Sequence, residues 1–453
     1  ITVSSLDIGH GLGGDATCTA VGNAALAASH TGTTRNTAIG YNALNDVNVD
    51  AGDYNVAVGS YAGDKITSGY SNTAVGDAAL RTIDGIQNTA VGQGALGADC
   101  VSNNTAVGKS ALAAFTGSNA TAVGSGAADV AGSQTNLTAV GMGALGVATS
   151  GNNNTAVGAS SLQTIDGAEN TAVGVSALAA DCVSSNTAVG YYALTGFTGS
   201  DATAIGVYAA DVAGSQTNLT AVGKNALGLS TSGNNNTAVG ATSLQTVDGA
   251  ENVAVGANAL AADCVSNNSA VGYNALNVFT GSNATAIGAY AADAATSAAN
   301  LTAVGKDALG ACTTGGDNTA VGLNSSLKAT TGNNNTTVGV SAGQENLTGT
   351  NNTFMGSVAG AFTSINDHCV GIGRSALAGA ASFTEGGGAY NNDPTITHTA
   401  DARIIAGLQV RGTGIPDGAT ISSITDGTHF ELSASTTGGN LTGQTLTFYQ
   451  NQG

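Results

Sequence analysis

Three cysteines have a spacing that could carry chemistry. Cys100, Cys182 and Cys264 each follow an aspartate and recur every 82 residues, and none of the six cysteines belongs to a CxxC motif. If 82 residues form five stacked coils, about 24 Å separates these thiols, whereas a disulfide joins Cα atoms within roughly 7 Å. We therefore expect buried free thiols and no zinc or redox motif. Cross-links between chains at the same level are the alternative.

Acidic residues recur with the same period and could bind calcium. Asp84, Asp166 and Asp248 lie in T-(I/V)-D-G turns. A second set, which follows pairs of Ala, is Asp129, Asp211 and Asp293. The dense acidic nonapeptide of calcium-binding β-rolls does not occur in the sequence. We expect turn and solvation roles, and we predict neither a metal nor a cofactor.

No set of residues predicts catalysis. The five histidines, His10, His30, His368, His398 and His429, lie mostly near the two ends and have no triad or nucleophile-elbow spacing. A glycan hydrolase needs two carboxylates paired in one cleft, and acids that repeat along a chain identify no such pair. We predict that the protein is not an enzyme and name no catalytic residue.

Tyrosines and threonines suggest two binding hypotheses. The tyrosines at variable repeat positions are Tyr41, Tyr191, Tyr192, Tyr208, Tyr273 and Tyr290. They could stack on sugars, but the chain has no Trp, so we favour packing at the rim of the fold. A recurring Thr column could bind ice, although a single column gives that hypothesis little support.

Composition excludes several classes of protein. Of 453 residues only 9% are charged, and the net charge of −19 provides no basic footprint for nucleic acid. No run reaches the roughly 18 apolar residues of a membrane-spanning segment, so we expect no membrane insertion. The abundant Gly, Ala, Val, Asn and Thr suit a thin, repetitive β structure.

The chain is built from one short repeat, NTAVGxxAL. It occurs 22 times between Gly22 and Gly373, with copies 16 or 17 residues apart after Gly59. A unit this short cannot form the helix pairs of α-solenoids and has no helical apolar period. Two short strands and two turns fit it. We therefore predict an all-β parallel β-solenoid, or β-roll, of about 22 rungs over residues 18–380, forming a shaft on the order of 105 Å long.

The first strand of each repeat is apolar on both faces. Ala stands two residues before the repeated Gly in nearly every copy, and Val or Ile stands directly before it. Successive strand residues face opposite sides, so one face fills the coil and the other needs a partner. Single exposed apolar residues are common, but monomers rarely expose a long apolar stripe. We expect copies of the chain to associate.

Other repeat positions predict columns of like side chains. Leu, four residues after the Gly, would form an aliphatic ladder that Ala128, Ala210 and Ala292 interrupt. Asn and Thr, four and three residues before the Gly, could hydrogen-bond along the axis. The Gly suits a positive φ or a close backbone approach.

Both ends of the chain depart from the repeat. Within residues 1–17, apolar and polar residues alternate in the segment ITVSSLDI. This pattern predicts a strand that caps the first coil or pairs with a neighbouring chain. The segment SFTEGGGAYNNDP predicts a linker over residues 381–394. Residues 395–453 alternate apolar and polar residues between Gly and Asp turns, which predicts a small C-terminal β module.

The repeat resembles a known class. NTAIGYNAL at Asn36, NTAVGYYAL at Asn186 and NSAVGYNAL at Asn268 are similar to the head repeat of trimeric autotransporter adhesins. Similar repeats occur in bacteriophage tail-fibre proteins, and the resemblance covers roughly residues 18 to 377. It implies a left-handed parallel β-roll, three chains around a common axis and a role in surface attachment.

These observations favour a non-enzymatic structural protein that forms an extracellular fibre or cell-surface filament for attachment. Its expected partners are two further copies of itself, more copies end to end, and a glycan or protein receptor on a cell surface. The alternative is a bacteriophage tail or capsid fibre in the virion, with receptor binding by the C-terminal module. A glycan-cleaving β-solenoid enzyme is the least favoured function.

Overall fold

The computed structural model describes residues 2–3, 6–9, 17–28, 35–47, 52–82, 84–130, 132–164, 166–212, 214–361, 367–377, 383–401 and 404–449. It divides into two units, Ile1–Asn274 and Ala275–Gly453, which are described separately below. All regular structure in the described residues is β-strand, and no helix there could span a membrane. The fold is a parallel β-solenoid of about 20–22 turns with a small antiparallel module, which confirms the predicted fold class.

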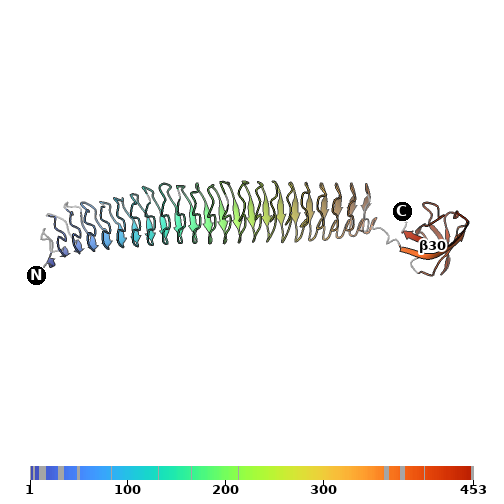
Figure 1. Cartoon of the computed structure of the whole chain (residues 1–453), viewed down its shortest axis with the longest axis horizontal. Coiled ribbons are helices and arrows are strands. Elements are labelled where there is room, and N and C mark those ends of the chain that lie inside the picture. The colour runs from blue at the N-terminus through green and yellow to red at the C-terminus, as the bar shows by residue number, and fades with distance from the viewer. Residues whose placement is uncertain are drawn as a thin grey trace. The chain divides into compact units, whose positions relative to one another are not determined.

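We call one turn of the solenoid, formed by one sequence repeat, a coil. In the first unit, each coil contributes one three-residue strand to a parallel sheet (Figure 1). Ahead of the coils stand β1 (Thr2–Val3) and β2 (Leu6–Gly9), and β2 pairs antiparallel with the first coil. The coil strands are β3 (Thr19–Val21), β4 (Thr37–Ile39), β5 (Val56–Val58), β6 (Thr73–Val75), β7 (Thr89–Val91), β8 (Thr105–Val107), β9 (Thr121–Val123), β10 (Thr138–Val140), β11 (Thr155–Val157), β12 (Thr171–Val173), β13 (Thr187–Val189), β14 (Thr203–Ile205), β15 (Thr220–Val222), β16 (Thr237–Val239), β17 (Val253–Val255) and β18 (Ser269–Val271).

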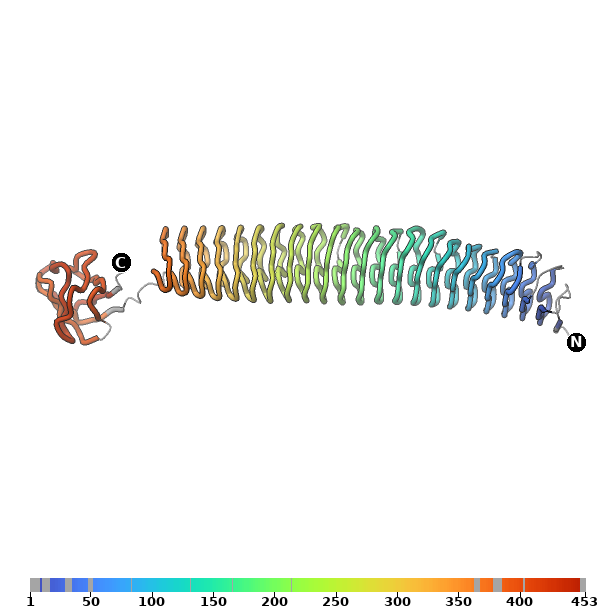
Figure 2. The backbone as a smooth tube through the Cα atoms, turned by 180° about the vertical axis from the view of Figure 1, so that it is seen from behind, coloured from blue at the N-terminus to red at the C-terminus, as the bar shows by residue number. Residues whose placement is uncertain are grey.

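The second unit begins with coils of the same kind and ends with the module (Figure 2). Its coil strands are β19 (Thr285–Ile287), β20 (Thr302–Val304), β21 (Thr319–Val321), β22 (Thr336–Val338), β23 (Thr353–Met355) and β24 (Val370–Ile372). The module strands are β25 (Phe383–Asn391), β26 (Thr395–Thr397), β27 (Gln409–Arg411), β28 (Ile421–Asp426), β29 (His429–Leu432) and β30 (Asn440–Tyr449).

The repeated Gly sets the register of the coils. Between β10 and β11, for example, Ala139 lies opposite Ala156, so like residues stack. Gly158 has a φ of 139°, and a Cβ there would lie 2.3 Å from the carbonyl oxygen of Gly174. Both reasons expected for the Gly therefore hold: its φ is positive and the next coil approaches its backbone.

The segment after the Gly differs from the expected second strand. In the coil of Gly158, Ser160 and Leu162 have φ values of 53° and 47°. Alternate residues in the left-handed region cannot continue an extended strand, so each coil has one strand and a turn. The turn still bonds to both neighbouring coils: Gly158 donates to Val140 and Leu162 donates to Ala177.

The coil interior holds three columns of buried side chains. The Ala of each strand and the Ala and Leu after the Gly are almost wholly buried, as Ala156, Ala177 and Leu162 illustrate. The predicted aliphatic ladder therefore forms. Phe115 and Phe197 are also fully buried, and each lies one coil before the interrupting Ala128 or Ala210.

A fourth buried column is Asn, whose side chains bond mainly to the backbone, although Asn335 Nδ2 also donates to Asn318 Oδ1 at 3.1 Å. Asn88 Oδ1 accepts a hydrogen bond from the backbone N of Asn104 at 2.9 Å, and its Nδ2 donates to the carbonyl of Val101 at 3.1 Å. Such bonding satisfies a buried amide like that of Asn88, whereas Asn252 Nδ2 is buried and has no hydrogen-bond partner among the described residues. The predicted Asn ladder is thus mainly a chain of side-chain-to-backbone bonds. Thr takes part through its backbone, since Thr89 N donates to Asn104 O.

The module is a six-stranded antiparallel sheet in the order β27-β30-β25-β26-β29-β28. Its core includes Tyr390, Ile396, Phe430, Leu446 and Phe448. The predicted linker over residues 381–394 was wrong for residues 383–391, because these form β25 and pair with β30. Glycines that suggested flexibility lie inside a strand, where register shifts around Gly388 accommodate them.

Candidate functional site

The outward face of the coil strands carries Thr and Val. Strand alternation buries Ala156 and leaves Val157 36% exposed beside the partly exposed Thr155. The same arrangement recurs at Val173 and Val189 in the next two coils. The outward strand face is therefore a half-exposed column of uncharged residues, repeated once per coil.

The periodic cysteines do not form a reactive site. Cys100, Cys182 and Cys264 are buried free thiols. Burial raises the pKa of Cys182 to about 12, which keeps the thiol protonated at neutral pH. This confirms the expectation of buried thiols for these three residues.

The periodic aspartates hold turns together between coils. Asp166 accepts hydrogen bonds from the Thr149 hydroxyl and the Thr149 backbone N at 2.6 and 3.1 Å. These bonds hold the pKa of Asp166 below its ordinary value. Asp248 is bonded in the same way by Thr231, which confirms the turn role. Among the described residues, no group of three or more His, Cys, Asp or Glu could hold a metal ion.

Tyrosines gather on two neighbouring coils. The Tyr191 and Tyr192 rings are 4.4 Å apart between centroids, and Tyr208 from the next coil is 5.6 Å from Tyr191. Tyr191 and Tyr208 remain partly exposed. The rings thus contact one another as the rim-packing hypothesis expects, and sugar stacking stays a hypothesis.

The predicted histidines are dispersed. His10 and His30 lie outside the described residues. His368 is exposed in the last coils, with its Nε2 3.4 Å from Asn351 Nδ2. Only His398 and His429 lie in the module, where β26 and β29 pair.

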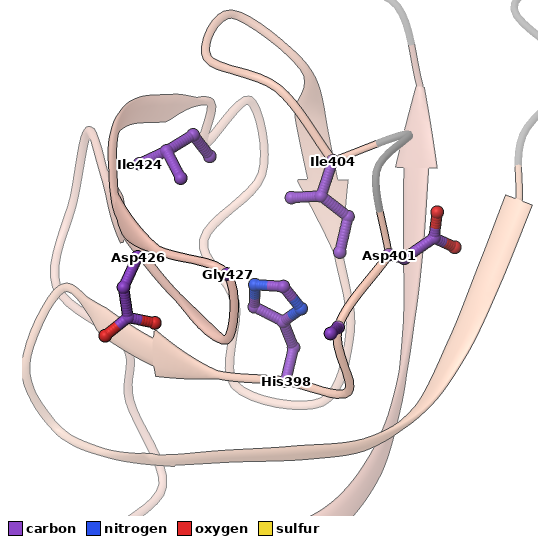
Figure 3. Close-up of a pocket in the computed structure, with 7 residues that line it drawn as sticks. His398, Asp401, Ile404, Ile424, Asp426 and Gly427 are labelled. Carbon is purple, nitrogen blue, oxygen red and sulfur yellow. The ribbon is translucent and has the colours of Figure 1, made fainter.

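The module contains a pocket of about 330 Å³ that sequence reasoning missed (Figure 3). Two segments form it: the chain after β26 as far as Ile404, and the end of β28 with the turn that leads into β29. The described residues that line it are His398, Ala400, Asp401, Ile404, Ile424, Asp426 and Gly427. No short sequence pattern joins these segments, because the antiparallel pairing of β26, β29 and β28 brings them together.

His398 provides the buried polar group of this pocket. Its side chain packs against Phe430, with ring centroids 5.2 Å apart, and the residue is 6% exposed. Nδ1 lies 2.6 Å from the carbonyl oxygen of Thr399. A carbonyl can only accept, so Nδ1 carries a proton, and in the neutral imidazole Nε2 is an acceptor. Nε2 is buried and has no hydrogen-bond partner among the described residues.

A carboxylate is fixed at the edge of the pocket. His429 Nδ1 lies 2.9 Å from Asp426, and the backbone N of Thr428 donates to the same carboxylate at 2.7 Å. These bonds, the one with His429 foremost, lower the pKa of Asp426 to about 2. The group is therefore ionised at neutral pH.

Comparison with known proteins adds no relative. No family model, curated protein or solved structure matches the chain.

Proposed function

We propose that the chain is a non-enzymatic structural protein that forms the shaft of an extracellular fibre for surface attachment. Copies associate side by side, three to a fibre as the repeat resemblance implies. The half-exposed column directly before the repeated Gly carries this proposal. Val157, Val173 and Val189 belong to it, and each stands beside an Ala that is fully buried.

The column favours a second copy of the same chain as its partner. Its residues recur at the spacing of parallel strands, about 4.8 Å. A surface that covers such a column over many coils must have the same repeat, and another copy has it. Each buried Val contributes little, but apolar area adds along the column at roughly 25 cal/mol per Å².

Charge does not oppose this association. The net charge is −19, yet the outward strand face consists of Thr, Val and a few like residues that carry no charge. Acids such as Asp166 and Asp248 lie in turns and not on the strand face. Repulsion between exposed acids falls off beyond about 8 Å at physiological ionic strength.

The native mass of the full chain tests the proposal. We expect a trimeric mass for the unmodified chain, and a monomeric, still folded chain after joint substitution of Val157, Val173 and Val189 by Asp. The matched control replaces Val101, Val183 and Val265 by Asp. These residues are exposed outside the strands, so the control should keep the trimeric mass. A folded but monomeric unmodified chain would refute the proposal.

The second candidate is a bacteriophage fibre whose C-terminal module binds the receptor. The pocket beside His398 favours it, because the described residues place that cavity in the module. Purified virions should then contain the chain, as detected by mass spectrometry. Its presence only on cell surfaces would favour the first candidate.

A further inference from the structure

The pocket of the C-terminal module has the features of a ligand site. At about 330 Å³ it lies at the small end of the range for ligand pockets, roughly 300–1,000 Å³. It is large enough for a single ring. Its walls combine the side chains of Ile404 and Ile424 with the His398 imidazole (Figure 3).

His398 determines what the ligand must offer. Because Nδ1 donates to Thr399, Nε2 presents a lone pair. That nitrogen is buried without a partner among the described residues, and an unpaired buried acceptor is costly. A ligand that brings an O–H or N–H donor to Nε2 removes this cost.

The described charges around the pocket disfavour two classes of ligand. The described lining residues include no Lys or Arg, while Asp426 is ionised at the edge. An anion would be repelled. A cation is disfavoured beside the His398 ring, because the Asp401 carboxylate points away from that ring in Figure 3 and both Asp426 oxygens already lie 2.9 Å from His429 Nδ1 at the edge.

We propose that this pocket binds one ring of a neutral saccharide. A sugar ring supplies a hydroxyl donor for His398 Nε2 and apolar C–H groups for Ile404 and Ile424. A further hydroxyl at the edge can donate to the Asp426 carboxylate, which remains acceptor-only. The site would give the proposed fibre its attachment point, but binding itself does not require the fibre.

Ligand-observed NMR and titration calorimetry on the full chain test the site. The probes are the methyl glycosides of glucose, galactose, mannose and N-acetylglucosamine, with butylamine and acetate as the cationic and anionic comparisons. We expect at least one glycoside to bind, and neither comparison to compete with it. Preference for butylamine or acetate would overturn the neutral-sugar assignment.

Two variants locate the binding in the pocket. His398→Asn keeps a donor near Thr399 but removes the Nε2 acceptor, and should weaken binding about 3- to 10-fold. Ile424→Glu places a charge on a wall residue that is already 41% exposed, and should abolish binding. Ser423→Ala, on the same strand but outside the lining, is the control.

Native mass separates this inference from the proposed function. A monomeric chain that binds a glycoside in the pocket would refute the fibre and keep the site. A trimeric chain that binds none of the four glycosides, or binds one equally well in the Ile424→Glu variant, would refute the site and keep the fibre.

Discussion

The coils and the C-terminal module bury apolar surface in opposite ways. In the coils, each buried residue stacks on its equivalent 16 or 17 residues away, as Ala139 does on Ala156. In the module, Tyr390 on β25 pairs with Leu441 on β30, and Phe430 on β29 contacts Phe448 on β30 in one mixed core. Stability is thus spread over many similar local contacts in the coils and concentrated in a few aromatic residues in the module. Loss of one buried side chain should therefore destabilise only nearby coils in the solenoid, but the whole sheet in the module.

The largest effect is expected in the module core. Phe430 is fully buried and lies 5.7 Å from Phe448 between ring centroids. Phe430→Ala should lower the free energy of unfolding of the module by about 3–5 kcal/mol. Hydrogen exchange should accelerate throughout β25 to β30 and stay unchanged in β3 to β18. Protection that persists in β28 and β29 would contradict a concentrated core.

A smaller and local effect is expected at the repeated Gly. Gly158→Ala forces a Cβ to 2.3 Å from the carbonyl of Gly174 at a φ of 139°. The strain should cost about 1–3 kcal/mol, with faster hydrogen exchange confined to the coils next to β11. In the module, a Cβ on Gly427 would have no atom within 4 Å, so Gly427→Ala should stay within about 0.5 kcal/mol. If Gly158→Ala and Gly427→Ala lowered the free energy of unfolding equally, the predicted difference between the coils and the module would be wrong.

Removing an Asn side chain from the ladder should lower local stability by no more than the Gly158→Ala substitution does. The effect should be equally confined to neighbouring coils. Asn88→Ala leaves the backbone N of Asn104 and the carbonyl of Val101 without their side-chain partner. We expect a loss of about 1–3 kcal/mol, measured by hydrogen exchange at Asn104. Asn103→Gly is the control, because Asn103 is exposed with a φ of 64° that Gly adopts freely. Exchange that spreads to distant coils would show cooperation that the comparison does not predict.

The smallest effect is the acid dependence of the module. Asp426 has its pKa lowered to about 2, chiefly by the bond with His429. A lowered carboxyl pKa contributes stability above the ordinary value of 3.8 that is lost as pH falls towards 2. The thermal midpoint of the module should therefore drop over this window, and the drop should shrink in Asp426→Asn. If the thermal midpoint of Asp426→Asn depended on pH in the same way, Asp426 would not be the group responsible.

The sequence predicted the coils because their pattern is local. Ala and Val alternate before an obligatory Gly, and this alone indicates the buried and outward faces of each strand. The second strand expected in each repeat does not form after the Gly, because nothing in a Leu such as Leu162 indicates a φ of 47°. Burial of the side chain offsets that strain, and it depends on neighbouring coils.

The pocket of the module was beyond sequence reasoning for the opposite reason. His398 and Ile404 follow β26, whereas Asp426 ends β28, and no common spacing links the two segments. Pairing of β26 with β29, and of β29 with β28, brings them together. The Gly-rich stretch of β25 likewise suggested a linker, because its partner β30 is about fifty residues further along the chain.

Like-on-like stacking also bears on how the length of this molecule can evolve. The blocks that begin at Asn154 and Asn236 are nearly identical, and in the described part of the coils each backbone bond between coils joins direct neighbours. Unequal recombination between two such blocks would insert or delete 82 residues and join coils that already fit each other. Related genes should therefore differ in length by whole five-coil steps. The chain can lengthen or shorten in this way because the newly joined coils stack as the old ones did.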